Sequence, residues 1–292
     1  MNSGNARGIT MMILAMALFT LNDTLIKAAM LHLPLFQAIA LRGVMVTILL
    51  AALAWATGNL RPDLSPRDKK LIFLRTLCDL GATATFLTAL HHMPLANMSA
   101  ILQMLPLLMT LAATLIYKEK LGWRRLSAIF IGLLGVMLII KPGSEAFNLW
   151  SVLGVISVIV VCARDILSRE ISNKASSIYI ALTNGVAATL MGFAGYFFQD
   201  WENVTAYDFS CLASGSLALS LALIVVVAAM RNGDVSAVTP FRYTAMIWAI
   251  LLGYLFFGEI PDGYSIIGIV LIIGSGLFTL LRESALRRSA KA

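Results

Sequence analysis

The chain contains 292 residues, of which 59% are hydrophobic and only 13% are charged. This composition excludes a soluble globular protein, because too little polar surface is present to cover so much apolar material in water. The net charge of +7 is better explained by loop residues that orient membrane helices than by nucleic-acid binding. We therefore expect an all-α, polytopic membrane protein that lies in a lipid bilayer.

Apolar runs of about twenty residues recur along the whole chain and fit a bilayer core of roughly 30 Å. Turn-forming residues such as Pro34, Pro94 and Pro142-Gly143 separate these runs. Ten transmembrane helices are predicted, in chain order at residues 9–29, 35–57, 70–91, 95–117, 122–140, 149–169, 176–198, 208–230, 235–257 and 263–281.

The basic residues of the connecting loops predict the orientation of these helices. If the N-terminus is cytoplasmic, Lys141 is the only Lys or Arg that falls in an external loop. Cytoplasmic loops of membrane proteins are enriched in Lys and Arg. We therefore expect a multi-pass protein of the cytoplasmic (inner) membrane with both termini in the cytoplasm.

The chain repeats its own pattern. An apolar run from Ser99-Ala100 to Glu119 is followed by a glycine-containing run, and Ser236-Ala237 to Glu259 begins a similar sequence. Such self-similarity indicates an internal duplication. We expect two five-helix repeats, residues 1–145 and 146–292.

Each predicted repeat has an odd number of spans, so the second enters the membrane in the opposite orientation. Inverted repeats are typical of transporters, whose binding site lies near the midplane where the halves meet. A central cavity between the two repeats is therefore predicted.

Charged residues within the predicted spans form two layers. Asp23 and Arg42 lie near the external boundary, whereas Arg164, Asp165 and Arg242 lie near the cytoplasmic one. Two interpretations are open. Asp23–Arg42 and Asp165–Arg242 are permanent ion pairs that neutralise buried charge, or these five residues are gates at the ends of the cavity, as charge within a membrane indicates function.

Other polar and aromatic residues at membrane depth are candidates for the cavity wall. Asp79, one turn from Thr83, lies between the two layers and is a candidate substrate or proton site, unless Arg75 holds it as an i, i+4 pair. Tyr243 and Trp248 are either cavity residues for aromatic or cationic groups or ordinary packing residues.

The two Ser-Ala…Glu…Gly units resemble the EamA-type family of the drug/metabolite transporter superfamily. Gly258-Glu259 keeps the Gly-Glu step of that family, whereas Lys118-Glu119 replaces its glycine. The resemblance covers essentially the whole chain and is closest to bacterial amino-acid and metabolite exporters. It implies ten helices around a central cavity, whose lining would include Asn22, Arg42, Asp79, Gln103, Asn184, Arg242 and Trp248.

We therefore expect an alternating-access secondary transporter that exports amino acids, aromatic and neutral ones among them, and related small metabolites. The alternatives are a transporter of organic cations or drugs, nucleotide-sugars or S-adenosylmethionine, and a channel, against which the two separate charge layers argue. No catalytic or metal-binding motif is recognised. We expect no enzyme activity, cofactor, metal or nucleic-acid partner, and a monomer or homodimer.

Overall fold

The computed structural model describes residues 3–58, 64–117, 123–141, 149–172, 174–232 and 235–289, and these residues form helices and their connections without a β-strand. The elements are α1 (Ser3–Ala29), α2 (Leu35–Ala56), α3 (Pro66–His92), α4 (Leu95–Leu102), α5 (Leu105–Tyr117), α6 (Trp123–Ile140), α7 (Leu149–Glu170), α8 (Ser177–Ala194), η1 (Gly195–Phe197), α9 (Ala206–Asn232), α10 (Val235–Val238), η2 (Thr239–Thr244), α11 (Ala245–Phe257) and α12 (Gly263–Ser289).

The helices have the length and composition of membrane spans. Within the described ranges, eight helical stretches are long and apolar enough to cross a bilayer, and two shorter apolar helices lie at Leu126–Ile140 and Gly263–Thr279. Large apolar side chains also cover the outer surface, for example Phe73, Phe197 and Val270, which are 61%, 84% and 61% exposed. The prediction of an all-helical, polytopic membrane protein is confirmed.

Two of the predicted spans are interrupted. The span at 95–117 divides into α4 and α5 at Gln103, and the span at 235–257 contains the 3-10 helix η2. The sequence explains both breaks, because Pro106 and Pro240 lack the backbone N–H that continues an α-helix, and their rings clash with the preceding turn. The two breaks touch, since Gln103 Nε2 donates a hydrogen bond of 3.0 Å to the carbonyl of Arg242.

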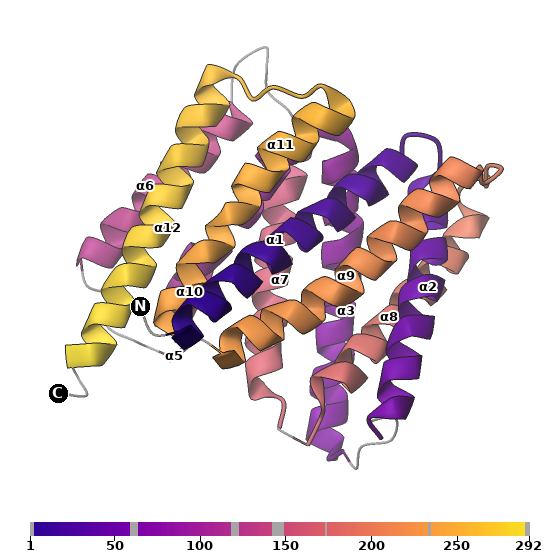
Figure 1. Cartoon of the computed structure of the whole chain (residues 1–292), viewed down its shortest axis with the longest axis horizontal. Helices are drawn as coiled ribbons and strands as arrows, with labels where there is room; N and C mark the ends of the chain where they lie inside the picture. The colour runs from indigo at the N-terminus through magenta and orange to yellow at the C-terminus, as the bar shows by residue number, and fades with distance from the viewer. Residues whose placement is uncertain are drawn as a thin grey trace.

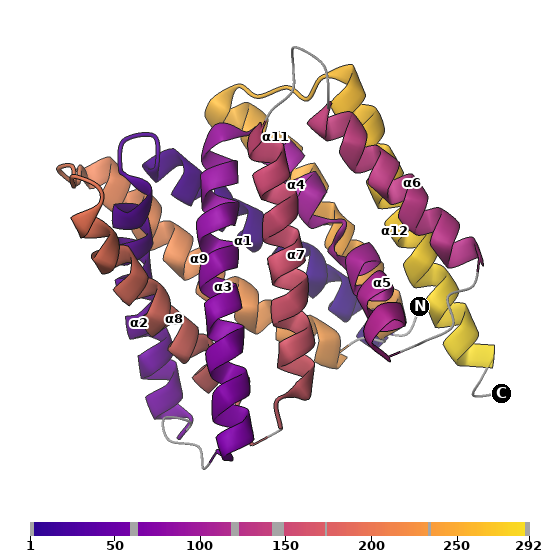
Figure 2. The same ribbon diagram turned by 180° about the vertical axis from the view of Figure 1, so that it is seen from behind.

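Helices of the first half pack in pairs against helices of the second half. The pairs with the most extensive contacts are α1 with α9, α2 with α8, α3 with α7 and α6 with α12, and both views show them side by side (Figures 1 and 2). Both chain termini lie at one end of the molecule (Figure 1). We call this end the terminal face and the opposite end the distal face.

The α2–α8 pair depends on small residues. A Cβ atom on Gly43 would lie 2.6 Å from Thr189 Oγ1, and a Cβ on Gly185 would lie 2.9 Å from Thr47 Oγ1. The two glycines therefore let the helices approach closely, as small residues do in membrane helix pairs. Because the first contact joins residue 43 to 189 and the second joins 47 to 185, α2 and α8 are antiparallel.

Two buried aspartates stabilise corresponding helix N-termini. Asp68 is 4% exposed, exchanges hydrogen bonds with Ser65 and accepts two from Ser172, beyond the end of α7. Asp208 is fully buried, bonds with Thr205 in the same way, and contacts His32 beyond the end of α1 at 3.2 Å. The hydroxyls of Ser65 and Thr205 thus cap α3 and α9, and each carboxylate holds its capping residue and fastens the helix to its antiparallel partner.

Candidate transport site

An ion cluster joins α3 and α7 within the bundle. Arg164 Nη1 of α7 lies 2.8 Å from Asp79 Oδ1 of α3, and Arg164 Nη2 lies 2.9 Å from Asp165 Oδ1. The three side chains are only 22% to 33% exposed. Charged groups at membrane depth are costly unless they are paired, and they commonly mark a substrate or ion pathway.

This geometry corrects two expectations about partners. Asp79 is held by Arg164 of another helix, whereas Arg75, the predicted intrahelical partner, donates a 2.8 Å hydrogen bond from Nε to Ser168 Oγ. The Asp165–Arg242 pair, one of the two interpretations left open for these charges, is not formed, because Asp165 pairs with Arg164 and Arg242 is exposed in η2. A sequence gives the position of each residue along its helix but not the direction of its side chain.

Arg42 of α2 connects this cluster to Asp23 of α1. The guanidinium of Arg42 lies within electrostatic range of both Asp23 and Asp79. Asp23 accepts its hydrogen bond from Asn22 Nδ2 at 2.9 Å, so among the described residues the direct Asp23–Arg42 ion pair is not formed. Charges of alternating sign therefore run from Asp23 through Arg42 and Asp79 to Arg164 and Asp165.

Two buried polar atoms beside Asp23 lack a hydrogen-bond partner in the protein. They are Arg42 Nε, a donor, and Asn22 Oδ1, an acceptor. A buried polar atom without a partner costs free energy, so its presence in a native structure calls for an explanation. A donor and an acceptor that flank the same carboxylate suit a ligand with both an anionic and a cationic group.

The remaining polar candidates divide between this region and its surroundings. Asn184 of α8 accepts a 3.0 Å hydrogen bond from Thr76, which lies one turn before Asp79 on α3. Thr83, one turn after Asp79, is half-buried. Gln103 lies instead at the α4–α5 break, in contact with η2.

The aromatic candidates pack in apolar surroundings. Tyr243 is 6% exposed and lies against α12, where a Cβ on Gly276 would meet its hydroxyl group. Trp248 belongs to a cluster with Met12, Met16 and Phe19. The hydroxyl of Tyr243 and Nε1 of Trp248 are also buried without a hydrogen-bond partner in the protein.

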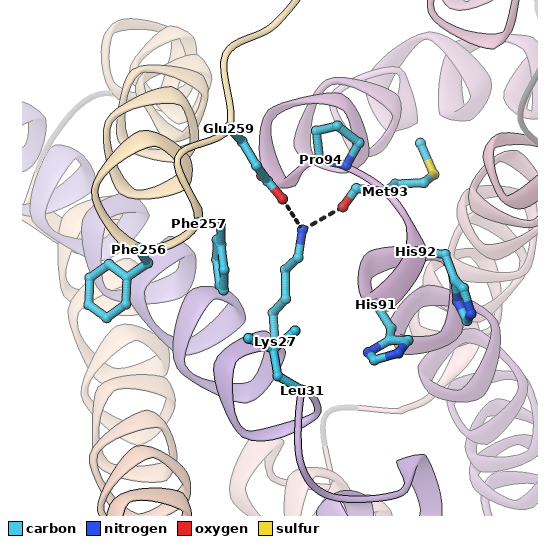
Figure 3. A pocket seen from close by; sticks show the side chains of 9 residues that line it. All are labelled: Lys27, Leu31, His91, His92, Met93, Pro94, Phe256, Phe257 and Glu259. Atoms are coloured by element: carbon cyan, nitrogen blue, oxygen red, sulfur yellow. Dashed lines mark hydrogen bonds and ion pairs between the residues drawn. The ribbon is translucent and has the colours of Figure 1, made fainter. Parts of the chain in front are cut away.

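A second polar site lies toward the distal face, in a cavity of about 510 Å³ between α1, α3 and the end of α11 (Figure 3). Lys27 of α1 is only 4% exposed, and its Nζ atom lies 2.5 Å from Glu259 Oε1 and 2.5 Å from the carbonyl of Met93. The second oxygen of Glu259 accepts a 2.7 Å hydrogen bond from the backbone N–H of Leu95. We call this arrangement the distal latch.

Sequence analysis placed neither Lys27 nor Glu259 among the site residues. A signal was present, because a lysine within an apolar span requires a counter-ion, and Gly258-Glu259 marks the end of a span. Gly258 has a left-handed φ of 65°, which ends α11 and turns Glu259 back toward the bundle. What the sequence does not show is that α1, α4 and α11 converge at this point.

The described residues contain no group of three or more His, Cys, Asp or Glu side chains that could hold a metal ion. The charged groups of the site can instead bind a small ion or molecule by hydrogen bonds and electrostatic attraction. Arginines offer donors in a fixed planar arrangement that suits carboxylates, and aspartates accept from ammonium groups.

Comparison with known proteins shows which family model the chain matches. The profile described as "EamA-like transporter family" matches this chain twice, at residues 6–141 and 148–281. A solved crystal structure shares the fold, with a TM-score of 0.66 at 19% identity, over 96% of this chain and 99% of the other.

Curated relatives are transporters. A pseudopaline exporter of Pseudomonas aeruginosa is 23% identical over 267 residues, which are 91% of this chain and 93% of the relative. An S-adenosylmethionine uptake transporter of Rickettsia bellii is 25% identical over 193 residues, 65% of each chain. A transporter of Helicobacter pylori is 26% identical over 282 residues, 94% of each chain.

Proposed function

This chain belongs to the EamA-like transporter family, and we propose that it is an alternating-access secondary transporter that exports amino acids and related small metabolites. Neutral and aromatic amino acids are the first candidates. We place it in the cytoplasmic membrane with both termini in the cytoplasm, so that the distal face is external. Its residues 1–145 and 146–292 would act as two inverted repeats around a central cavity.

The two unpartnered atoms beside Asp23 carry the substrate proposal. Arg42 Nε is a buried donor without a partner in the protein, and Asn22 Oδ1 is a buried acceptor without one. A zwitterionic amino acid supplies what each lacks, a carboxylate for Arg42 and an ammonium group for Asn22 and Asp23. A cation alone would leave Arg42 Nε unsatisfied, and therefore an amino acid fits better than an organic cation.

One relative supports recognition of an amino-acid group. It transports S-adenosylmethionine, a molecule that itself ends in an α-amino acid group. The S-adenosylmethionine transporter is an uptake protein, whereas another relative is an exporter. The relatives therefore do not determine the direction of transport by this chain. We propose export because the distal latch joins α1, α4 and the end of α11 on the distal side. Substrate would then reach the charged cluster first from the terminal face.

Flux into and out of proteoliposomes tests the proposal. We expect saturable transport of radiolabelled L-phenylalanine, inhibited more strongly by unlabelled phenylalanine than by phenylalanine amide, which lacks the carboxylate, or 3-phenylpropionate, which lacks the ammonium group. Arg42→Gln should raise KM at least tenfold, equivalent to about 1.4 kcal/mol, and should remove the discrimination against the amide. The control is Arg169→Gln, an exposed arginine of α7.

Other outcomes would point to the rival functions. Transport of organic cations, nucleotide-sugars or S-adenosylmethionine without transport of any common amino acid would contradict the substrate assignment. Flux that does not saturate and shows no counter-transport would indicate a channel. Comparison of right-side-out with inverted membrane vesicles determines whether export or uptake predominates.

A further inference from the structure

A long apolar groove separates α3 from α8 on the outside of the bundle. Its volume is about 560 Å³, and it is lined almost entirely by apolar side chains of the two helices. Phe73 and Leu190, two of its lining residues, are 61% and 64% exposed. α3 packs mainly on α7 and α8 mainly on α2, and the groove lies between α3 and α8.

The groove has the length of one bilayer leaflet. It extends from Lys69 to Leu80 along α3 and from Tyr179 to Leu190 along α8. Each distance is roughly 16 Å at a rise of 1.5 Å per residue, about half of a hydrocarbon core of roughly 30 Å. It begins in the first turns of both helices, at the terminal face, and therefore ends near the membrane midplane.

One end of the groove carries a lysine that forms no ion pair with the described residues. Lys69 lines this end and is exposed, and it has no ion pair with the part of the chain that the structure describes. Two neighbouring charged residues are already engaged, because Asp68 accepts hydrogen bonds from Ser65 and Ser172, and Arg67 lies 3.4 Å from Glu170. Basic side chains at the ends of transmembrane helices attract anionic lipid headgroups.

We propose that this groove binds a phospholipid with an anionic headgroup from the leaflet at the terminal face. One acyl chain lies between α3 and α8, and the headgroup phosphate meets Lys69 at the groove mouth. Tyr179, in the first turn of α8, lines the groove at the level where tyrosines are enriched at membrane interfaces. A membrane lipid fits better than a protein partner, because both walls lie on helices at membrane depth.

Binding of phosphatidylglycerol and phosphatidylcholine with identical acyl chains to the purified full-length protein, measured by native mass spectrometry, tests this site. We expect phosphatidylglycerol to bind more tightly. Lys69→Gln should weaken its binding about fivefold, which corresponds to about 1 kcal/mol per basic side chain, without changing phosphatidylcholine binding. Lys69→Arg should restore it. Lys70→Gln is the matched control, since Lys70 is the exposed next residue but does not line the groove.

The acyl chain is tested separately. Ala187→Trp should fill the groove and weaken binding of both lipids, while Tm of the lipid-free protein reports whether the variant is folded. Equal effects of Lys69→Gln and Lys70→Gln would overturn the site in favour of general surface attraction. Equal affinity for the two lipids would overturn the anionic headgroup, and competition by glycerol phosphate would overturn the need for an acyl chain.

Discussion

Arg164 holds two carboxylates, Asp79 and Asp165, through different nitrogen atoms of its guanidinium group. Arginine suits this position because its planar group offers several donors in fixed directions and stays protonated. A lysine could neutralise one carboxylate, but it could not span both with the same geometry. The residue therefore supplies the counter-charge for two acidic groups within the bundle.

Replacement of Arg164 should lower the stability of the folded protein. We expect Arg164→Gln to lower the free energy of unfolding by about 3–5 kcal/mol, because Asp79 and Asp165 would remain as unpaired buried charges. Adding Asp79→Asn to that variant should recover part of the loss. Thermal unfolding in detergent measures both effects, with Arg169→Gln as the control on the same helix. Equal Tm values for Arg164→Gln and this control would show that the cluster does not contribute to stability.

The sequence predicts the charges of Asp23 and Arg42 and those of Arg164 and Asp165 as two separate layers, with Asp79 between them. The structure instead joins Asp79 directly to Arg164, which also holds Asp165. The partners depend on which helices touch and how each is rotated. A single sequence does not show how each helix is rotated about its axis. The long side chain of a buried arginine can reach carboxylates on more than one neighbouring helix.

At the scale of helices, the apolar pattern predicted where chains cross the membrane but not where helices break. Hydropathy does not distinguish Pro106 and Pro240 from their apolar neighbours, although both end regular hydrogen bonding. The start of α3 was placed too late, at residue 70, because charged residues follow Pro66. The side chain of Ser65 accepts from the N–H of Asp68 and so caps the helix four residues earlier.

The close approach of α2 and α8 makes a prediction about glycine. A Cβ on Gly192 would lie 2.4 Å from the backbone nitrogen of Ala40, whereas a Cβ on Gly274 of α12 meets nothing within 4 Å. We expect Gly192→Ala to lower Tm strongly, since backbone atoms must move apart. Gly274→Ala should be neutral or stabilising by up to about 1 kcal/mol, because alanine favours helix.

Thermal unfolding of the two purified variants compares the same substitution at two helical sites. The change in helix propensity is the same in both variants. The difference in Tm between them therefore reports the contact between α2 and α8. Similar Tm values for Gly192→Ala and Gly274→Ala would contradict close packing of α2 on α8.

For the whole molecule, the proposed alternating-access cycle gives the distal latch the role of holding the distal end closed. Lys27, Glu259 and the start of α4 are held together by a buried ion pair and a backbone hydrogen bond. Alternating access requires this contact to break whenever the distal end opens. The latch is therefore expected to control the balance between the two states rather than the affinity for substrate.

Glu259→Gln tests this expectation. The amide still accepts the hydrogen bond of Leu95 but loses the charge that pairs with Lys27, so the population open at the distal face should rise. A cysteine placed at His91, which lines the distal cavity, should then react faster with a membrane-impermeant thiol reagent. Asp200→Asn, a charge change in the exposed connection before α9, is the control. Unchanged labelling rates would show that the ion pair does not hold the distal end closed.

At the crossing of α2 and α8, each helix makes the same glycine–threonine contact with the other. Gly43 faces Thr189 as Gly185 faces Thr47, and the two threonine hydroxyls lie 3.3 Å apart. In the proposed alternating-access cycle, a rocking movement centred on this crossing would change the contact little, while the two ends of the helices would move furthest. The crossing would then act as a pivot, so that opening of one end of the transporter is coupled to closing of the other.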